Sequence, residues 1–188
     1  MKGLVEPIKT KKDVEAVENY LKKNSKRNQL IWVFGINTGL RVSDILCLNI
    51  ADVKNKTYIE IKEKKTKKYK KFPLNQKLQN LIKDYLENER AHTYSTDECE
   101  PLFVGKKHCR LDRSQVYRFL NSTCKLLGVN ANVGTHTMRK TFGYFHYKQF
   151  NDVALLQKIL NHSSPSITLR YIGIAQDEID LSYSNFEL

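Results

Sequence analysis

Residues 57–74, TYIEIKEKKTKKYKKFPL, break an otherwise helical pattern and decide the fold class of this chain. Within them, TYIEIK alternates apolar and polar side chains with the two-residue period of a strand, and KEKKTKKY is a polar turn. KKFPL then resumes the extended run as far as Pro73, a residue that suits the end of an edge strand. The stretch therefore predicts a β-hairpin with a lysine-rich tip.

Segments on both sides of this hairpin repeat apolar residues at the spacing of amphipathic helices. Thr10, Ser43 and Ser164 are predicted helix starts, and Gly39 and Gly128 are predicted helix ends. The predicted helical ranges are 10–23, 29–40, 42–49, 75–90, 113–128, 134–150, 152–162 and 164–173. Together with the hairpin they indicate an α+β fold that is mainly α-helical with a small antiparallel sheet.

The composition is that of one globular unit. The 188 residues, 40% of them apolar, suffice to bury a single core. No apolar run approaches the roughly 20 residues that span a bilayer, and the N-terminus lacks the apolar segment of a signal peptide, so we expect a cytoplasmic protein. Cys47, Cys99, Cys109 and Cys124 show no zinc-binding or disulfide spacing, and we expect reduced thiols and no metal.

Positive charge is concentrated in the predicted hairpin. The formal net charge is +12, and residues 54–71 hold nine lysines against two glutamates. Such a balance favours a polyanionic partner, with nucleic acid ahead of an anionic membrane surface, because phosphate neutralisation releases counterions. Clustering on one element is a stronger sign of nucleic-acid binding than the total charge.

Several polar residues could carry chemistry, although each taken alone favours a structural role. His136 and Arg139 are three residues apart, so on a helix they share a face that could meet one phosphate or only solvent. Arg41 follows a glycine-ended helix, and His162 could close a helix C-terminus. Tyr171 is one of ten tyrosines and would ordinarily pack half-buried.

Taken in order, the stretches TGLRVSDIL, KTKKYKKFPL, HTMR and LNHSSPSITLRY resemble the motifs of the tyrosine recombinase, or phage integrase, family. That family has an arginine in T-G-x-R, a lysine in a hairpin turn, a His-x-x-Arg motif, a histidine in L-G-H-x-S and a nucleophilic tyrosine nine residues later. By this resemblance the active site comprises Arg41, Lys65, His136, Arg139, His162 and Tyr171.

Two positions need comment within the resemblance. Lys65 is preferred over its lysine neighbours because its Lys-Thr dipeptide lies eight residues before Pro73, as in the family. Asn161 stands where the family usually has glycine, and asparagine also tolerates a left-handed backbone, so we expect the turn to survive. The other tip lysines are expected to bind DNA, namely Lys64, Lys67, Lys68 and Lys70.

The resemblance also implies a reaction. A tyrosine oxygen attacks a DNA phosphodiester, giving a 3′-phosphotyrosine and a free 5′-hydroxyl without metal, ATP or another cofactor. Two guanidiniums would meet the developing charge, His136 would accept the phenolic proton, and Lys65 would protonate the leaving oxygen. His162 would hydrogen-bond a non-bridging oxygen.

The likeness runs from about Lys9 to Tyr171, which is the family's catalytic domain only. We therefore expect residues 1–188 to be that domain without core-binding and arm-binding domains, either as a fragment or as a natural short form. The expected partners are double-stranded DNA, three further copies in a homotetramer on two DNA sites, and accessory DNA-bending proteins. The tail, residues 176–188, either docks on a neighbouring protomer or packs on its own domain.

Two other functions remain open at this point. A type IB topoisomerase-like enzyme would share the tyrosine and arginines but relax DNA instead of exchanging strands. A DNA-binding module descended from a recombinase would keep the fold without catalysis. The context LNHSSPSITLRY resembles recombinases, and topoisomerases of this type have longer chains, which favours the recombinase over the first alternative. Retention of all six residue types argues against the second.

Overall fold

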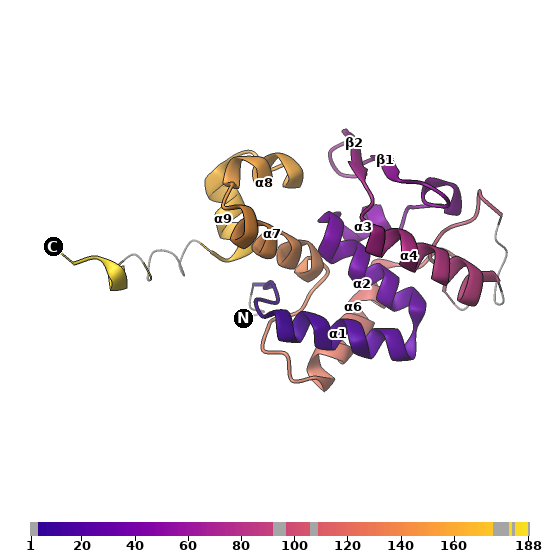
Figure 1. Ribbon diagram of the computed structural model, residues 1–188, viewed down its shortest axis with the longest axis horizontal. Helices are drawn as coiled ribbons and strands as arrows, with labels where there is room; N and C mark the ends of the chain where they lie inside the picture. The colour runs from indigo at the N-terminus through magenta and orange to yellow at the C-terminus, as the bar shows by residue number, and fades with distance from the viewer. Residues whose placement is uncertain (1–3, 92–96, 106–108, 175–180, 182, 188) are drawn as a thin grey trace.

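The computed structural model describes residues 4–91, 97–105, 109–174, 181 and 183–187. Its order is α1 (Lys11–Asn24), α2 (Lys26–Thr38), α3 (Val42–Ile45), the 3₁₀ turn η1 (Ile50–Asp52), β1 (Tyr58–Lys62), β2 (Tyr69–Pro73), α4 (Gln76–Tyr85), the π-helical turn η2 (Leu86–Arg90), α6 (Arg113–Leu126), α7 (Thr137–Phe150), α8 (Val153–Leu160) and α9 (Pro165–Ile172). Figure 1 shows α7, α8 and α9 together on one side of the molecule and the β1–β2 hairpin above α4 on the other. The predicted α+β class, mainly helical with a small antiparallel sheet, is confirmed.

The hairpin forms where the two-residue period predicted it. β1 and β2 pair antiparallel, with Tyr58 opposite Pro73 and Lys62 opposite Tyr69. Ile59 points inward and is fully buried, while Tyr58 and Tyr69 are exposed. This alternation ties one face of the hairpin to the protein core and leaves the other to solvent.

Most helix ends follow the predicted capping residues. The Thr10 side chain accepts from the Asp13 backbone at the start of α1, and Gly39 ends α2 in the left-handed conformation with φ +62°. The predicted start at Ser43 is wrong, since α3 begins at Val42 and Arg41 is its N-cap. The Arg41 backbone supplies the cap, because its carbonyl already accepts from Asp44 and Ile45.

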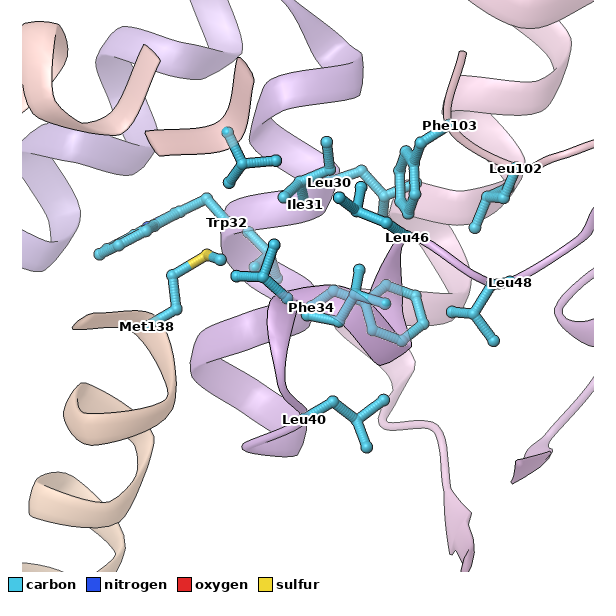
Figure 2. Close-up of a cluster of buried hydrophobic side chains, with 14 of the residues drawn as sticks. Leu30, Ile31, Trp32, Phe34, Leu40, Leu46, Leu48, Leu102, Phe103 and Met138 are labelled. Atoms are coloured by element: carbon cyan, nitrogen blue, oxygen red, sulfur yellow. The ribbon is translucent and has the colours of Figure 1, made fainter. Parts of the chain in front are cut away.

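Helix α2 is the centre of the main core. Residues 30–34 of α2 are all buried, because apolar side chains surround the helix and α1, α4 and α7 pack around it. Figure 2 shows Trp32, Phe34 and Met138 among these side chains. α7 approaches α2 at Gly35, where an added Cβ would lie 2.6 Å from the Met138 Cβ. The absence of a side chain at Gly35 thus sets how closely α7 sits on the core.

Helices α8 and α9 build a second, smaller cluster. Its buried residues are Leu156, Leu160, Ile172 and Ile174, and aromatic residues of α7 pack against it. We call residues 153–174 the α8–α9 lobe. Because this lobe has its own apolar cluster, its position against the main core depends on α7 and on polar bonds described below.

Part of the predicted tail lies in the described residues. Leu181, Tyr183 and Phe186 expose 58%, 83% and 70% of their surface, and Figure 1 shows this segment apart from the helical body. Ile179, which the tail prediction also covers, lies outside the described residues. Within the described ranges, no helix combines the length and apolarity that a membrane crossing requires.

Candidate active site

Arg41 occupies the break between α2 and α3, as its position after Gly39 predicted. Gly39 ends α2 in the left-handed conformation, and the Arg41 side chain that follows it reaches Glu63 of the hairpin. Its Nη1 lies 3.1 Å from Glu63 Oε2 and 3.9 Å from Asp44 Oδ2, and both of these carboxylates are buried. Arg41 therefore lies at the edge of a buried charged cluster, with 15% of its side chain exposed.

Arg139 lies in the first turn of α7 and is 2% exposed. Its Nη1 donates to the Gly39 carbonyl at 2.6 Å and its Nη2 to the Leu160 carbonyl at 2.5 Å. The first acceptor ends α2 and the second ends α8. One guanidinium thus joins the main core to the α8–α9 lobe and places its charge between them.

His136 and Tyr171 meet although they are 35 residues apart. His136 is the N-cap residue of α7, outside the helix proper, and its Nδ1 lies 3.1 Å from the Tyr171 hydroxyl of the same chain. Burial raises the pKa of Tyr171, and the charges of Arg139 and Arg41 only partly oppose this. The phenol is thus protonated at neutral pH and needs a proton acceptor, for which His136 is in hydrogen-bond reach.

The pKa of His136 favours that role. Burial lowers it, and the nearby charges of Arg139, Lys140, Arg41 and Lys65 lower it further. An imidazole with a pKa below its usual 6.5 is neutral at pH 7. A neutral ring has one nitrogen free to accept a proton.

His162 lies beside the nucleophile, with its ring centroid 4.8 Å from that of Tyr171. Its Nδ1 lies 3.1 Å from the Thr168 hydroxyl, which itself donates to the Ser164 carbonyl. Since a hydroxyl has one proton, we assign the ring proton to Nδ1, which leaves Nε2 as an acceptor. Burial and the charges of Arg139 and Arg41 lower the pKa of His162 to about 4, so the ring is neutral at pH 7.

Lys65 is exposed at the hairpin tip. Two backbone hydrogen bonds hold the tip. The Lys64 amide donates to Asp44 Oδ1 at 3.0 Å, and the Lys67 amide donates to the Glu63 carbonyl. Lys67 itself adopts the left-handed conformation, with φ +59°. The side chains of Lys64 and Lys67 are exposed. The exposed Lys68 ammonium donates to Asn161 Oδ1 at 3.1 Å.

Lys70 differs from the other predicted DNA-binding lysines. It is half-buried, and its Nζ donates to the Ile159 carbonyl at 3.0 Å. Burial, followed by the charge of Arg139, lowers its pKa to about 8. The strand register explains this, because Lys70 pairs with Ile61 and shares the inner side of the hairpin with it.

Sequence reasoning missed the two buried acids, Asp44 and Glu63. A signal was present for Glu63, because Ile59, Ile61 and Glu63 continue one two-residue alternation whose first member is buried. The same alternation therefore predicts that Glu63, and not Glu60, points inward. No group of three or more His, Cys, Asp or Glu able to hold a metal is found among the described residues.

Comparison with known proteins identifies the family. Residues 9–178 match the model described as the phage integrase family. The chain therefore belongs to this family, whose members include tyrosine recombinases. The resemblance recognised from the sequence motifs is thereby confirmed.

Individual relatives give the scale of the likeness. The chain is 40% identical to the probable integrase/recombinase YoeC of Bacillus subtilis, over 97% of either protein. It is 32% identical to the tyrosine recombinase XerH of Campylobacter jejuni, over 92% of this chain and 48% of the relative. The chain thus spans nearly all of the first relative and about half of the second.

Solved structures support the fold. A crystal structure of XerA recombinase matches 99% of this chain and 68% of its own, with a TM-score of 0.77 and 21% identity. XerH bound to a palindromic difH substrate matches 97% of this chain and 54% of its own, with a TM-score of 0.75 and 23% identity. These likenesses establish a tyrosine recombinase catalytic-domain fold.

Proposed function

We propose that this chain is the catalytic part of a site-specific DNA recombinase that breaks and rejoins DNA through a 3′-phosphotyrosyl intermediate. The observation that carries the proposal is the 3.1 Å approach of His136 Nδ1 to the Tyr171 hydroxyl. Family membership and the proximity of Arg139 and Arg41 to this pair support it further. All of these groups come from one chain, so the proposed cleavage uses a nucleophile supplied in cis.

In the proposed reaction the Tyr171 oxygen bonds to phosphorus while the bond from phosphorus to the 5′-oxygen breaks. His136 takes the phenolic proton, and Lys65 gives a proton to the departing 5′-oxygen. The phosphodiester is exchanged for a phosphotyrosine, so rejoining by a 5′-hydroxyl needs no ATP. Lys65 is assigned here because its Lys-Thr dipeptide has the family's spacing to Pro73, and its exposure at the tip agrees with this. The Lys70 ammonium, by contrast, is already bonded to a backbone carbonyl.

Arg41 and Arg139 are proposed to stabilise the extra negative charge on the non-bridging oxygens. A guanidinium has five N–H donors, so Arg139 can hold the Gly39 and Leu160 carbonyls and still donate to phosphate. In the absence of DNA, Nε2 of the neutral His162 ring carries no proton. We propose that an adjacent phosphate raises its pKa, so that it gains a proton and donates to an oxygen.

The proposed partners are double-stranded DNA and further copies of this chain. A λ integrase tetramer bound to a Holliday junction has the same fold, with a TM-score of 0.69 and 16% identity. For this chain we propose a homotetramer on two DNA sites, with the exposed Lys64, Lys67 and Lys68 facing phosphates. The exposed apolar tail residues, Leu181, Tyr183 and Phe186, are proposed to dock on a neighbouring protomer.

The proposal is tested by isolating protein–DNA adducts under denaturing conditions from cells that express the chain. Wild type should yield adducts enriched at one DNA site, and Tyr171→Phe should yield none. Tyr117→Phe is the matched control, because Tyr117 is exposed on α6 and should leave the adducts unchanged. Adducts of equal yield from Tyr171→Phe would contradict the proposal.

A second assay separates strand exchange from relaxation. Two duplexes carrying the recovered DNA site should give recombinant joints with wild-type protein. Relaxation of a supercoiled plasmid without any joints would instead indicate a topoisomerase-like activity.

A further inference from the structure

Glu63 is a buried acid inside a cluster of cations. Its side chain is 2% exposed, and Arg41, Lys70 and Arg139 all lie close enough to interact electrostatically with it. A carboxylate repels the phosphate that the proposed reaction must bind, and burying one is costly unless it is paired. A buried carboxylate at this position therefore indicates a structural or functional role for Glu63.

One oxygen of Glu63 gathers three partners from three parts of the chain. Oε2 lies 3.1 Å from Arg41 Nη1, accepts from Thr66 Oγ1 at 2.5 Å and accepts from Asn161 Nδ2 at 3.3 Å. We call these four residues the Glu63 clasp. Oε1 is buried, and within the part of the chain that the structure describes it has no hydrogen-bond partner.

Each partner is a candidate catalytic residue or adjoins one. Arg41 is a proposed phosphate ligand, Thr66 follows Lys65, and Asn161 precedes His162. The three segments are the α2–α3 break, the hairpin tip and the end of α8. One carboxylate thus touches the segments that carry the proposed acid and two proposed phosphate ligands.

The clasp also supplies bonds between the two parts of the fold. The hairpin is bonded to the end of α8 through Glu63 and Lys68, which contact Asn161 at 3.3 and 3.1 Å, and through Lys70, which donates to the Ile159 carbonyl. Glycine at position 161 would keep the left-handed backbone, φ +53°, but could make neither bond. The asparagine therefore adds contacts at a position where the backbone needs no side chain.

Charge is part of this arrangement. Burial by itself raises the pKa of Glu63, but the hydrogen bond from Thr66, the charge of Arg41 and the bonds from Asn161 and Arg41 outweigh it and lower the pKa. The carboxylate is therefore ionised at neutral pH. An ionised acceptor strengthens each hydrogen bond that it receives.

From these contacts we infer that Glu63 is a positioning residue that fixes the hairpin tip, Arg41 and the α8–α9 turn against one another, so that Lys65 and His162 face the same phosphate. The chemical part of this inference rests on the proposed function. The mechanical part, a coupling between the hairpin and the turn, does not require DNA.

The coupling is tested first without DNA, by amide hydrogen exchange. The Lys67 amide donates to the Glu63 carbonyl and the His162 amide to the Gln157 carbonyl, so they report on the tip and on the turn. Glu63→Gln should raise exchange at both amides about tenfold, as expected for loss of a charge-assisted bond. Asn161→Gly, which removes both bonds of the Asn161 side chain but keeps the backbone, should raise exchange at Lys67 as well.

The matched control is Glu60→Gln. Glu60 lies on β1, three residues before Glu63, and is also bonded to a cation, Lys71 at 2.5 Å, but it is exposed. This control should leave both amides unchanged. Exchange that rises at neither amide, or at the hairpin amide alone in Glu63→Gln, would overturn the inference.

The positioning role is tested with the duplex recovered from the adducts, synthesised with either oxygen or sulfur at the bridging 5′ position. A thiolate leaves without being protonated, so the sulfur duplex bypasses the general acid. Lys65→Ala should cleave the oxygen duplex slowly and the sulfur duplex near the wild-type rate. Glu63→Gln should cleave the oxygen duplex about 10²-fold more slowly, because a misplacement near 1 Å costs that much. On the sulfur duplex its defect should be smaller but still present, because sulfur replaces only the Lys65 step while Arg41 and His162 stay displaced. Glu60→Gln should be normal on both.

Equal slowing of Glu63→Gln on both duplexes, or no slowing on either, would overturn the positioning role. If wild-type protein forms no adduct at all, the proposed function fails. The amide exchange experiment then still decides whether the Glu63 clasp couples the two segments.

Discussion

Gly35→Ala adds a single methyl group to the centre of α2 and tests how the core positions the candidate site. The new Cβ would lie 2.6 Å from the Met138 Cβ and 2.7 Å from its Sδ, whereas ordinary contact begins near 3.4 Å. The start of α7 must therefore retreat by about 0.8 Å. Arg139 follows Met138, so its 2.6 Å bond to the Gly39 carbonyl would lengthen to about 3.4 Å, beyond normal hydrogen-bond length.

The expected cost in stability is modest. Overpacking costs about 1–3 kcal/mol, and alanine regains about 1 kcal/mol of helix propensity, so the free energy of unfolding should fall by about 0–2 kcal/mol. For a chain of this size that lowers the melting temperature by about 8 °C at most. Adduct formation should fall far more, by about 10²-fold, because the displaced Arg139 no longer meets the phosphate.

The assay measures adduct yield per folded protein together with thermal melting. Gly105→Ala is the control, since the nearest atom to its new Cβ, Gln115 Nε2, would lie at 3.3 Å instead of 2.6 Å, and it should leave both quantities nearly unchanged. Normal adduct yield from Gly35→Ala would refute the reasoning. A yield that falls only as far as the loss of folded protein would also refute it.

Three further predictions concern charge. The single-turnover cleavage rate should stay constant from neutral pH down to pH 6.5. Below pH 6.5 the rate should fall as His136 gains a proton, because burial lowers the pKa of this imidazole. A fall already near pH 7.5 would contradict the role of His136 as the base. Arg139→Lys should lower the free energy of unfolding by about 1–3 kcal/mol, measured by denaturant titration, because one ammonium cannot span the Gly39 and Leu160 carbonyls; unchanged stability would refute both bonds. Burial lowers the pKa of Lys70 to about 8 in the folded protein, so between pH 8 and 10.5 the unfolded chain keeps a proton that the folded protein has lost. The free energy of unfolding of the wild type, relative to that of Lys70→Met, should therefore rise over this pH range by on the order of 1–3 kcal/mol. A difference that does not change with pH would contradict the buried position of Lys70.

Local patterns predicted the elements of this fold well. The hairpin followed from its two-residue period, and Thr10 and Gly39 marked helix ends through short-range hydrogen bonding and backbone conformation. Ser43 misled because a serine can cap a helix, but here the Arg41 backbone had already supplied the first acceptor. The residue type alone does not indicate which backbone carbonyl accepts the first hydrogen bond of the helix.

The assembly of the site was not accessible from local patterns. His136 and Tyr171 come together only because α8 and α9 fold back on α7, and their pairing was expected solely through the family motifs. The inward turn of Lys70 and the burial of Glu63 depend on the hairpin docking on α8, about 90 residues away in the chain. Strand parity indicates which side chains point inward, but it does not reveal what they meet.

The central claim is that Tyr171 is the nucleophile and that it takes the 3′-phosphate. The most direct measurement digests purified adducts with nuclease and protease and identifies the modified peptide by mass spectrometry. The account predicts a nucleotide joined through its 3′-phosphate to Tyr171, in the peptide that follows Arg170. A nucleotide on any other residue, or one joined through a 5′-phosphate, would contradict it.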